Sequence, residues 1–297
     1  MGILEGKVAA ITGGGRGIGK AVAKAMAAQG AAVVVNDLGV SVAGEKETTS
    51  PADAVAAEIR QSGGKAVSNH QDIATMEGGR GLTDQAIKEF GKLDILVNIA
   101  GILRDRMIFS MSEEEWDAVI RVHLKGHFCC IHYASIHMRE RKAGRIINFS
   151  SNAALGTPGQ PNYAAAKAGI LGLTYSCANA LFKYGITSNA VLPGAATRMT
   201  DTVPAGRTPG APMISSENAE GTPMDPANVA PLVIFLASDE AAGINGQAFG
   251  ASGYRITHYA HIQAYRTLAN TGPWNLDRLF KVFKPTFGRE LKPPPIF

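Results

Sequence analysis

A glycine-rich segment near the start of the chain restricts the fold more than any other feature. Residues 12–19 read TGGGRGIG, after a short apolar run from Lys7 to Thr12 and before an alanine-rich stretch from Ile18 to Gln29. An apolar strand, a glycine turn and a helix in this order are typical of the first βα unit of a nucleotide-binding fold. Glycines let the backbone approach a pyrophosphate, and the helix N-terminus offers unpaired N–H groups. We therefore expect a phosphate-bearing ligand at this turn.

The rest of the chain continues the alternation of strand and helix. Further strands are predicted at residues 31–37, 65–72, 93–98, 145–150 and 186–192, with a last strand at 247–252. Helices are predicted from Pro51, over 83–90, from Ser112 to Arg139, around 163–167 and from Asp225 to Ala237. Repeated βα units predict an α/β fold with a doubly wound parallel sheet of the Rossmann type, in a three-layer αβα arrangement. Ligands bind such sheets at the carboxyl ends of the strands.

Two regions interrupt this alternation. Residues 200–224 are rich in Pro, Gly, Ser and Thr and follow a strand directly, so we expect a lid there, with a passive surface loop as the alternative. Beyond Gly253 the sheet pattern ends, although residues 254–297 hold several aromatic side chains among basic ones. The sequence thus predicts one domain over 1–253 and a C-terminal extension over 254–297 that packs on the domain or on a partner subunit.

Composition argues against several classes of function. The 297 residues are 45% apolar and 18% charged, which suits a large folded core. A net charge of +4 without a dense Lys/Arg run gives no indication of nucleic-acid or membrane-surface binding. No apolar stretch reaches the roughly 20 residues that cross a membrane. Cys129, Cys130 and Cys177 lack CxxC spacing, so free thiols and a cytoplasmic location are expected.

No metal site is expected either. One predicted helix carries four histidines, His123, His127, His132 and His137. Only the first two are four residues apart, and no glutamate stands between them as in the HExxH pattern of zinc enzymes.

Tyr163 and Lys167 indicate the chemistry. Residues four apart share a helix face, so the lysine ammonium would lie beside the tyrosine hydroxyl and favour the phenolate. A phenol whose pKa is ~10 in water could then act as an acid or base nearer neutral pH. Together with the upstream glycine turn and the serine pair Ser150-Ser151, this spacing predicts a hydride-transfer site.

Asp37 bears on the choice of dinucleotide. It ends the second predicted strand, where a carboxylate accepts hydrogen bonds from the adenosine ribose and repels a 2′-phosphate. NAD is therefore expected rather than NADP. Arg16 in the glycine turn can pair with a phosphate and weakens this preference.

These features together resemble the short-chain dehydrogenase/reductase family. The glycine turn, the segment 98–101 (NIAG), Ser151, the Tyr163/Lys167 pair and Pro193-Gly194 follow the family's order, over about residues 4–253. The segments VVVNDLG (33–39), AGILRDR (100–106) and RVHLKG (121–126) are similar to the dehydrogenase unit of peroxisomal D-specific multifunctional enzymes. They also resemble bacterial (3R)-hydroxyacyl-CoA and 17β-hydroxysteroid dehydrogenases. The resemblance implies an oxidoreductase that interconverts a secondary alcohol and a ketone on a CoA thioester or a steroid.

The resemblance also implies roles for catalytic residues. Tyr163 is the expected general acid/base, and Lys167 lowers its pKa and holds the nicotinamide ribose. A serine bonds the substrate oxygen; counting from the strand end gives Ser151, whereas distance to the tyrosine gives Ser150. We choose Ser151, because a loop absorbs a one-residue deletion more easily than a strand end does. His123 stands where the family usually has a proton-relay asparagine, and both a relay and a structural role stay open.

The residues expected to contact the cofactor run from the glycine turn to the nicotinamide side. They are Gly13, Gly15, Arg16, Gly17, Ile18, Gly19, Asp37, Asp72, Ile73, Asn98, Ala100, Gly101, Tyr163, Lys167, Pro193, Gly194 and Thr197. Among them, Asp72 is expected at the adenine amino group, and Thr197 at the nicotinamide.

Two alternatives stay open. The chain could be an NADPH-dependent 3-oxoacyl carrier-protein reductase, which Asp37 and the long aromatic tail oppose. It could also be a non-catalytic dinucleotide-binding subunit, since a fold can persist without its chemistry. By resemblance, a homodimer or homotetramer is expected in either case.

Overall fold

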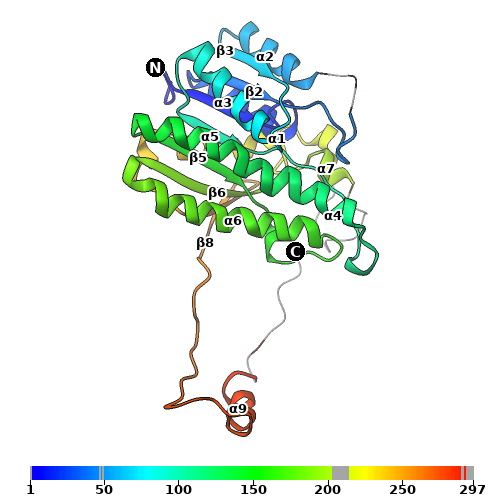
Figure 1. Cartoon of the computed structure of the whole chain (residues 1–297). Helices are drawn as coiled ribbons and strands as arrows, with labels where there is room; N and C mark the ends of the chain where they lie inside the picture. Colours follow the sequence, from blue (N-terminus) through cyan, green and yellow to red (C-terminus); the bar gives the residue numbers. More distant parts are fainter. Residues whose placement is uncertain (1, 47, 49, 203–213, 289–290, 292–297) are drawn as a thin grey trace.

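Short apolar runs, each followed by a turn, form the parallel strands of a central sheet (Figure 1). They are β1 (Val8–Thr12), β2 (Ala32–Asn36), β3 (Lys65–Asn69), β4 (Ile95–Asn98), β5 (Gly144–Phe149), β6 (Ile186–Gly194) and β7 (Ala248–Ser252). The spatial order is β3-β2-β1-β4-β5-β6-β7-β8, so the winding reverses between β1 and β4. The computed structural model describes all residues except 1, 47, 49, 203–213, 289–290 and 292–297.

Helices cover both faces of the sheet, which buries the central strands. The apolar cluster on one face includes residues of α1 (Gly17–Ala28), α2 (Pro51–Gln61) and α8 (Ala230–Ala237). The cluster on the other includes residues of α3 (Met76–Phe90), α5 (Gly126–Arg141) and α6 (Pro161–Leu181). The predicted doubly wound αβα fold is confirmed. No helix among the described residues is long and apolar enough to span a bilayer.

The sheet has one strand more than the sequence predicted. β8 (Arg255–Tyr259) turns back at Gly253 and pairs antiparallel with β7, from Ser252 opposite Arg255 to Ala248 opposite Tyr259. The prediction that 247–252 is the last strand was therefore wrong. Four of the five β8 residues are exposed and the fifth is half-buried, so the strand lacks the apolar run that marks the other strands.

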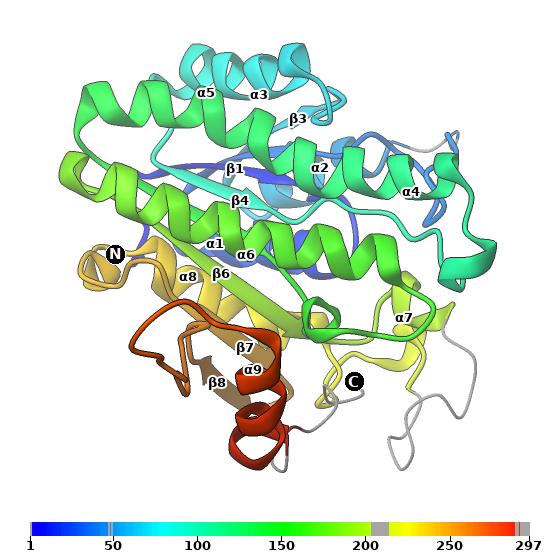
Figure 2. The ribbon, with the colours of Figure 1, turned by 60° about the horizontal axis from the view of Figure 1, so that its bottom comes forward.

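The chain continues from β8 as an arm, defined here as residues 260–288. It contains the short helix α9 (Leu276–Phe283), followed by a π-helical turn over Lys284–Gly288. Figure 1 shows α9 at a distance from the layers of the domain, and Figure 2 shows the same arm turned toward the viewer, in front of β7 and β8.

The predicted helix over 112–139 is interrupted. α4 (Glu113–Ile120) begins with the expected capping box between Ser112 and Glu115, which is confirmed. A π-helical turn, Arg121–Lys125, then separates α4 from α5. A π-turn leaves one residue more per turn than an α-helix, and such turns are frequent at functional sites. Here the inserted turn carries His123.

The predicted lid at 200–224 is only partly described. α7 (Arg198–Asp201) begins it, and residues 203–213 lie outside the described part of the chain. The segment 214–224 is built from turns, one of which ties Ser216 to Asp201.

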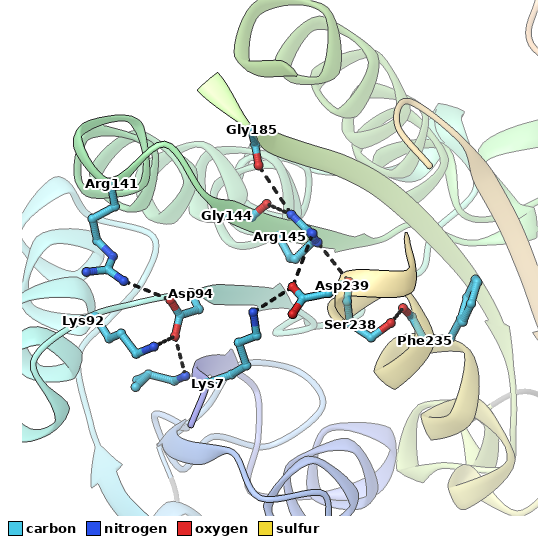
Figure 3. A network of polar contacts seen from close by, with 11 residues as sticks. Lys7, Lys92, Asp94, Arg141, Gly144, Arg145, Gly185, Phe235, Ser238 and Asp239 are labelled. Carbon is cyan, nitrogen blue, oxygen red and sulfur yellow. Dashed lines mark hydrogen bonds and ion pairs between the residues drawn. The ribbon is translucent and has the colours of Figure 1, made fainter. Parts of the chain in front are cut away.

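Polar contacts join neighbouring strands at the N-terminal ends of the strands (Figure 3). The Asp94 carboxylate accepts hydrogen bonds from the Val8 N–H at 2.9 Å and from Lys92 Nζ at 2.9 Å. The Arg145 guanidinium donates to the carbonyl oxygens of Ser238 and Gly185, at 3.2 and 3.4 Å. Hydrogen bonds and ion pairs thus stabilise the N-terminal ends of the strands. The cavity described next lies at their carboxyl ends.

Candidate active site

The carboxyl ends of the parallel strands surround a cavity of about 480 Å³. It lies where the winding of the sheet reverses, the usual position for a ligand in this architecture. Its wall joins the glycine turn to the helix with the predicted catalytic pair. The expected site residues that line it are Gly13, Arg16, Gly17, Ile18, Gly19, Asp37, Ile73, Ala100, Gly101, His123, Tyr163, Lys167, Pro193 and Thr197.

The glycine turn forms a cradle that side chains would fill. Gly13 and Gly17 have φ values of +65° and +48°, which favour glycine. A Cβ on Gly13 would come within 2.8 Å of the Ala100 Cα, and a Cβ on Gly19 would overlap the Gly13 carbonyl oxygen. The side chain at the helix N-cap, Arg16, makes no capping hydrogen bond to α1. These features fit the pyrophosphate of a dinucleotide at the α1 N-terminus.

Asp37 is fixed at the end of β2, beside the glycine turn. Its carboxylate accepts hydrogen bonds from the backbone N–H groups of Gly15, at 3.1 Å, and of Gly39, at 2.9 Å. Arg16 turns toward the following loop, where its Nη1 donates to the Val40 carbonyl at 3.2 Å. The Asp37 carboxylate therefore lies where it could accept hydrogen bonds from the hydroxyls of an adenosine ribose.

The loop after β2 is a part of the site that sequence reasoning missed. Residues 38 and 40–44 line the cavity. The Leu103 N–H donates to the Val42 carbonyl at 2.9 Å, and Arg104 Nε donates to the Ala43 carbonyl at 2.8 Å. All these acceptors are backbone carbonyl groups. The side chains of the loop therefore gave no sign in the sequence that the loop lines the cavity.

Tyr163 and Lys167 face each other one turn apart on α6. The Lys167 Nζ lies 5.4 Å from the centroid of the Tyr163 ring and donates a hydrogen bond of 2.6 Å to the Phe149 carbonyl. Lys167 is only 3% exposed. The end of β5 thus holds the ammonium group under the tyrosine.

Burial dominates the proton affinities of this pair. It raises the pKa of Tyr163 to about 12, against the hydrogen bond from Ser151, which acts to lower it. Burial also lowers the pKa of Lys167 to about 7. For Tyr163, the desolvation of the phenolate outweighs the effect of the Ser151 hydrogen bond.

The two adjacent serines make different contacts. The Ser151 side chain hydrogen-bonds to that of Tyr163, and its Oγ accepts from the Ala153 N–H at 3.1 Å. The Ser150 Oγ instead donates to the Lys167 backbone carbonyl at 2.8 Å and is buried. The hydrogen bond of Ser151 thus acts on the proton affinity of Tyr163, whereas Ser150, which lines the cavity, fastens α6 to β5.

His123 packs edge-on against Tyr163, with 5.1 Å between ring centroids. Its Nε2 is 2.8 Å from the Ile102 carbonyl oxygen, and its buried Nδ1 has no hydrogen-bond partner among the described residues. Burial lowers the pKa of His123 well below its usual value, so the ring is neutral. A side chain on Gly101 would overlap this ring, so glycine leaves room for it.

Four of the expected cofactor residues are not among those that line the cavity: Gly15, Asp72, Asn98 and Gly194. The Asn98 side chain is buried behind the cavity wall and donates to Asn148 Oδ1 at 3.0 Å. Asp72 pairs with Arg121 at 2.9 Å, while its neighbours Gln71 and Ile73 line the cavity. A Cβ on Gly15 would press on Asp37, and a Cβ on Gly194 would press on Ser252.

Known proteins resemble the chain over most of its length. A family model described as enoyl-(acyl carrier protein) reductase matches residues 13–253. The chain is 44% identical over 263 residues to hydroxyacyl-CoA dehydrogenase ChsB1 of Mycobacterium tuberculosis, covering 86% of this chain and 80% of that protein. It is 42% identical over 247 residues to peroxisomal multifunctional enzyme type 2 of Mus musculus, covering 83% of this chain and 31% of the mouse protein.

Two further matches extend the comparison. The 3-oxoacyl-[acyl-carrier-protein] reductase of Synechocystis is 41% identical over 260 residues, with 85% of this chain and 98% of that protein covered. The crystal structure of a short chain dehydrogenase from Mycobacterium avium matches with a TM-score of 0.85 at 40% identity, over 100% of this chain and 99% of the other. Because the sequence matches and this fold agree, the chain belongs to the short-chain dehydrogenase/reductase family and is an oxidoreductase that acts on CH–OH groups with a nicotinamide dinucleotide.

Proposed function

We propose that this protein is an NAD-dependent dehydrogenase of 3-hydroxyacyl-CoA thioesters, with 17β-hydroxysteroids as the second substrate class. The observation that carries the chemistry is the pairing of Tyr163 with buried Lys167 on the cavity wall, where Ser151 hydrogen-bonds to Tyr163. The thioester is supported by the names of the mycobacterial hydroxyacyl-CoA dehydrogenase and of a peroxisomal hydratase-dehydrogenase-epimerase from Neurospora crassa, which is 47% identical over 201 residues.

Tyr163 exchanges the proton of the substrate hydroxyl. In the oxidation, the ionised Tyr163 oxygen takes the O–H proton as the carbonyl forms, and in the reduction the neutral phenol returns it. Ser151 hydrogen-bonds to the substrate oxygen and holds it near the tyrosine. When bound, the nicotinamide accepts or supplies the hydride of the carbinol carbon.

Lys167 positions the other partners of the reaction. The Phe149 carbonyl holds its Nζ at 2.6 Å, on the cavity wall under Tyr163. From there the ammonium can donate to the hydroxyls of the nicotinamide ribose. The positive charge of its protonated form also favours the phenolate of Tyr163 over the neutral phenol.

The preference for NAD over NADP rests on Asp37. Two backbone N–H groups hold its carboxylate at the cavity wall, where it can accept from ribose hydroxyls and repels a 2′-phosphate. Replacing Asp37 with alanine should therefore raise kcat/KM with NADP relative to NAD. An unchanged ratio would contradict the assignment.

A panel of substrates tests the function directly. NADH formation is measured with (3R)-hydroxyacyl-CoAs of short and long chain and with 17β-hydroxysteroids. Reduction of 3-oxoacyl carrier protein by NADPH is the third arm, because the Synechocystis reductase matches over nearly its whole length. Turnover in that arm alone would overturn the proposal in favour of a carrier-protein reductase.

The variant Tyr163→Phe separates catalysis from cofactor binding. It should lose nearly all turnover and still quench or enhance NADH fluorescence as the parent protein does. Retained turnover would contradict the role of Tyr163. NADH binding without oxidation of any alcohol by the parent protein would instead support a non-catalytic dinucleotide-binding subunit.

The proposal includes a cytoplasmic location and a homo-oligomeric state. The cysteines Cys129, Cys130 and Cys177 are free thiols, which agrees with the reducing cytoplasm. Exposed apolar side chains outside the cavity, such as Phe128 and Ile136 on α5, support a homo-oligomer.

A further inference from the structure

Tyr259 ends β8 and is half-buried, whereas the other four residues of this strand are exposed. Its ring packs against a cluster formed by Ala190 and Leu192 on β6 and Ala248 on β7. Leu171 of α6 packs on the same cluster, so Tyr259 lies on the face of the sheet that α6 covers. Through Tyr259, β8 thus contacts the interior of the domain.

A glycine on β7 leaves room for this ring. A Cβ on Gly250 would come within 3.1 Å of Tyr259 Cε2 and within 3.5 Å of its Oη. A carbon contact of 3.1 Å is closer than the optimal separation of two carbon atoms, so a side chain here would press on the ring. Since Tyr259 is paired with Ala248, its ring extends from the beginning of β7 toward the carboxyl end of that strand.

The hydroxyl of Tyr259 bonds to the turn that follows Ser151. Its Oη donates to Asn152 Oδ1 at 2.7 Å, although the two residues are 107 positions apart in the chain. Asn152 begins the short helical turn η3 (Asn152–Leu155), for which Ser151 is the N-cap. The Ser151 Oγ accepts from the Ala153 N–H at 3.1 Å, so the serine side chain is itself part of this turn. The position of Ser151 therefore depends on the position of η3.

The main chain is fixed on both sides of Tyr259. Before it, β8 pairs with β7 along its whole length. After it, His261 Nε2 lies 2.6 Å from the Gly246 carbonyl oxygen, and the His261 ring centroid lies 4.9 Å from that of Tyr175. A side chain that is locked by packing and backbone pairing can hold a neighbouring group in one geometry. Tyr259 meets this condition toward Asn152.

We propose that Tyr259 is a positioning residue of the active site, which holds Asn152 and η3 so that Ser151 faces Tyr163 and the substrate oxygen. Tyr259 is not among the residues that line the cavity, so it acts through Ser151. The antiparallel strand β8 then supports the active site as well as extending the sheet. This inference rests on the proposed function, because it concerns the serine of that reaction.

Hydrogen exchange tests the support of η3 without any substrate, so its outcome does not depend on the proposed function. Tyr259→Phe keeps the ring and removes only the hydroxyl. Amide exchange in the peptide 151–156, which contains the bonded N–H groups of Ala153 and Ala154, should become about fivefold faster. Tyr254→Phe is the matched control, because this tyrosine lies in the same hairpin and is 75% exposed. Unchanged exchange in Tyr259→Phe, or equal acceleration in Tyr254→Phe, would overturn the proposal.

A double-mutant cycle tests whether Tyr259 acts through Ser151. Tyr259→Phe should lower kcat about tenfold and leave KM nearly unchanged, because the serine bond to the substrate oxygen strengthens in the transition state. In the Ser151→Ala background the same change should cost less than about twofold, since the group that Tyr259 positions is gone. A tenfold loss in both backgrounds would overturn the proposal. Absence of turnover by the parent protein would contradict the proposed function instead, and the exchange experiment would still decide the role of Tyr259.

The acceptor of the hydrogen bond provides a second variant. Asn152→Ala should reproduce both effects of Tyr259→Phe, and the double variant should be no worse than either single one, because the two changes remove the same bond. Additive losses of kcat would show that the two residues act independently and would contradict the positioning role. Circular dichroism and NADH fluorescence check that all variants keep the fold and bind the cofactor as the parent protein does.

Discussion

Ser150 and Ser151, the two residues that follow β5, have different roles: Ser150 is structural and Ser151 is placed for catalysis. Both side chains contact α6: Ser150 donates to the Lys167 backbone carbonyl, and Ser151 hydrogen-bonds to the Tyr163 side chain. The sequence could predict the strand end and so favour Ser151. It could not predict the bond of Ser150 to the Lys167 carbonyl, because that contact joins elements far apart in the chain.

Alanine at each serine separates the two roles. Ser151→Ala should lower kcat/KM by about 10²- to 10³-fold, as expected for a lost hydrogen bond to charge that develops in the transition state. Ser150→Ala should leave kcat/KM within about tenfold and cost about 1 kcal/mol in the free energy of unfolding. Steady-state kinetics and urea unfolding measure both, and equal kinetic losses would contradict the assignment.

The titration of Tyr163 predicts different pH profiles for oxidation and reduction. Alcohol oxidation needs the ionised phenol, whose fraction rises with pH below the pKa of about 12, so kcat/KM should increase between pH 7 and 10. Ketone reduction uses the neutral phenol and should change little there. Lys167, with a pKa of about 7, loses its charge early in this range and makes the rise shallower than tenfold per unit. An oxidation rate that falls over the range would contradict this mechanism.

His123 leaves a buried nitrogen beside the tyrosine without a partner among the described residues. Buried polar atoms of this kind usually bond an ordered water, which here would extend a proton route from Tyr163. We expect His123→Asn to keep most of kcat and His123→Leu to lose about 10²-fold. The readout is the solvent isotope effect on kcat, which should change in the leucine variant. Equal activity of the two variants would show that His123 is structural.

Among the elements, those with an apolar period were predictable and those held by backbone contacts were not. β1 to β7 were predicted within a few residues; for β1, β2 and β4 the reason is that burial on both faces demands continuous apolar runs. β8 has exposed side chains, and the loop over 38–44 is held by its carbonyl groups. The π-turn that positions His123 also has no residue signature, since it differs from an α-helix only in hydrogen-bond register.

The contacts at the beginning edge of the sheet give an element-scale prediction. Asp94 is largely buried and bonds the Val8 N–H, so Asp94→Ala should cost about 1–3 kcal/mol in the free energy of unfolding. Lys7→Ala removes only an exposed ion pair with Asp239 and should cost about 0–1 kcal/mol. Urea unfolding followed by circular dichroism compares them, and similar losses would show that Asp94 has no special role in joining the strands.

At the scale of the molecule, the sequence predicted where the αβα domain is but not how its extension is placed. Aromatic residues beyond Gly253 indicated a surface contact, and their exposure in the arm agrees with a surface outside the domain that carries it. The exit direction depends on β8 and on the His261 contact, neither of which has a local sequence signal. Residue patterns within one chain also do not predict contacts with another chain.

The hairpin of β7 and β8 is the part of the sheet that should separate most easily when the C-terminal arm is pulled. The arm leaves from the open end of this hairpin, so a pull on the arm loads the antiparallel bonds one after another, starting at Tyr259. The parallel strands behind it share such a load across several bonds. A tethered chain stretched through its C-terminus should therefore first unzip β8 at low force and leave a seven-stranded domain intact.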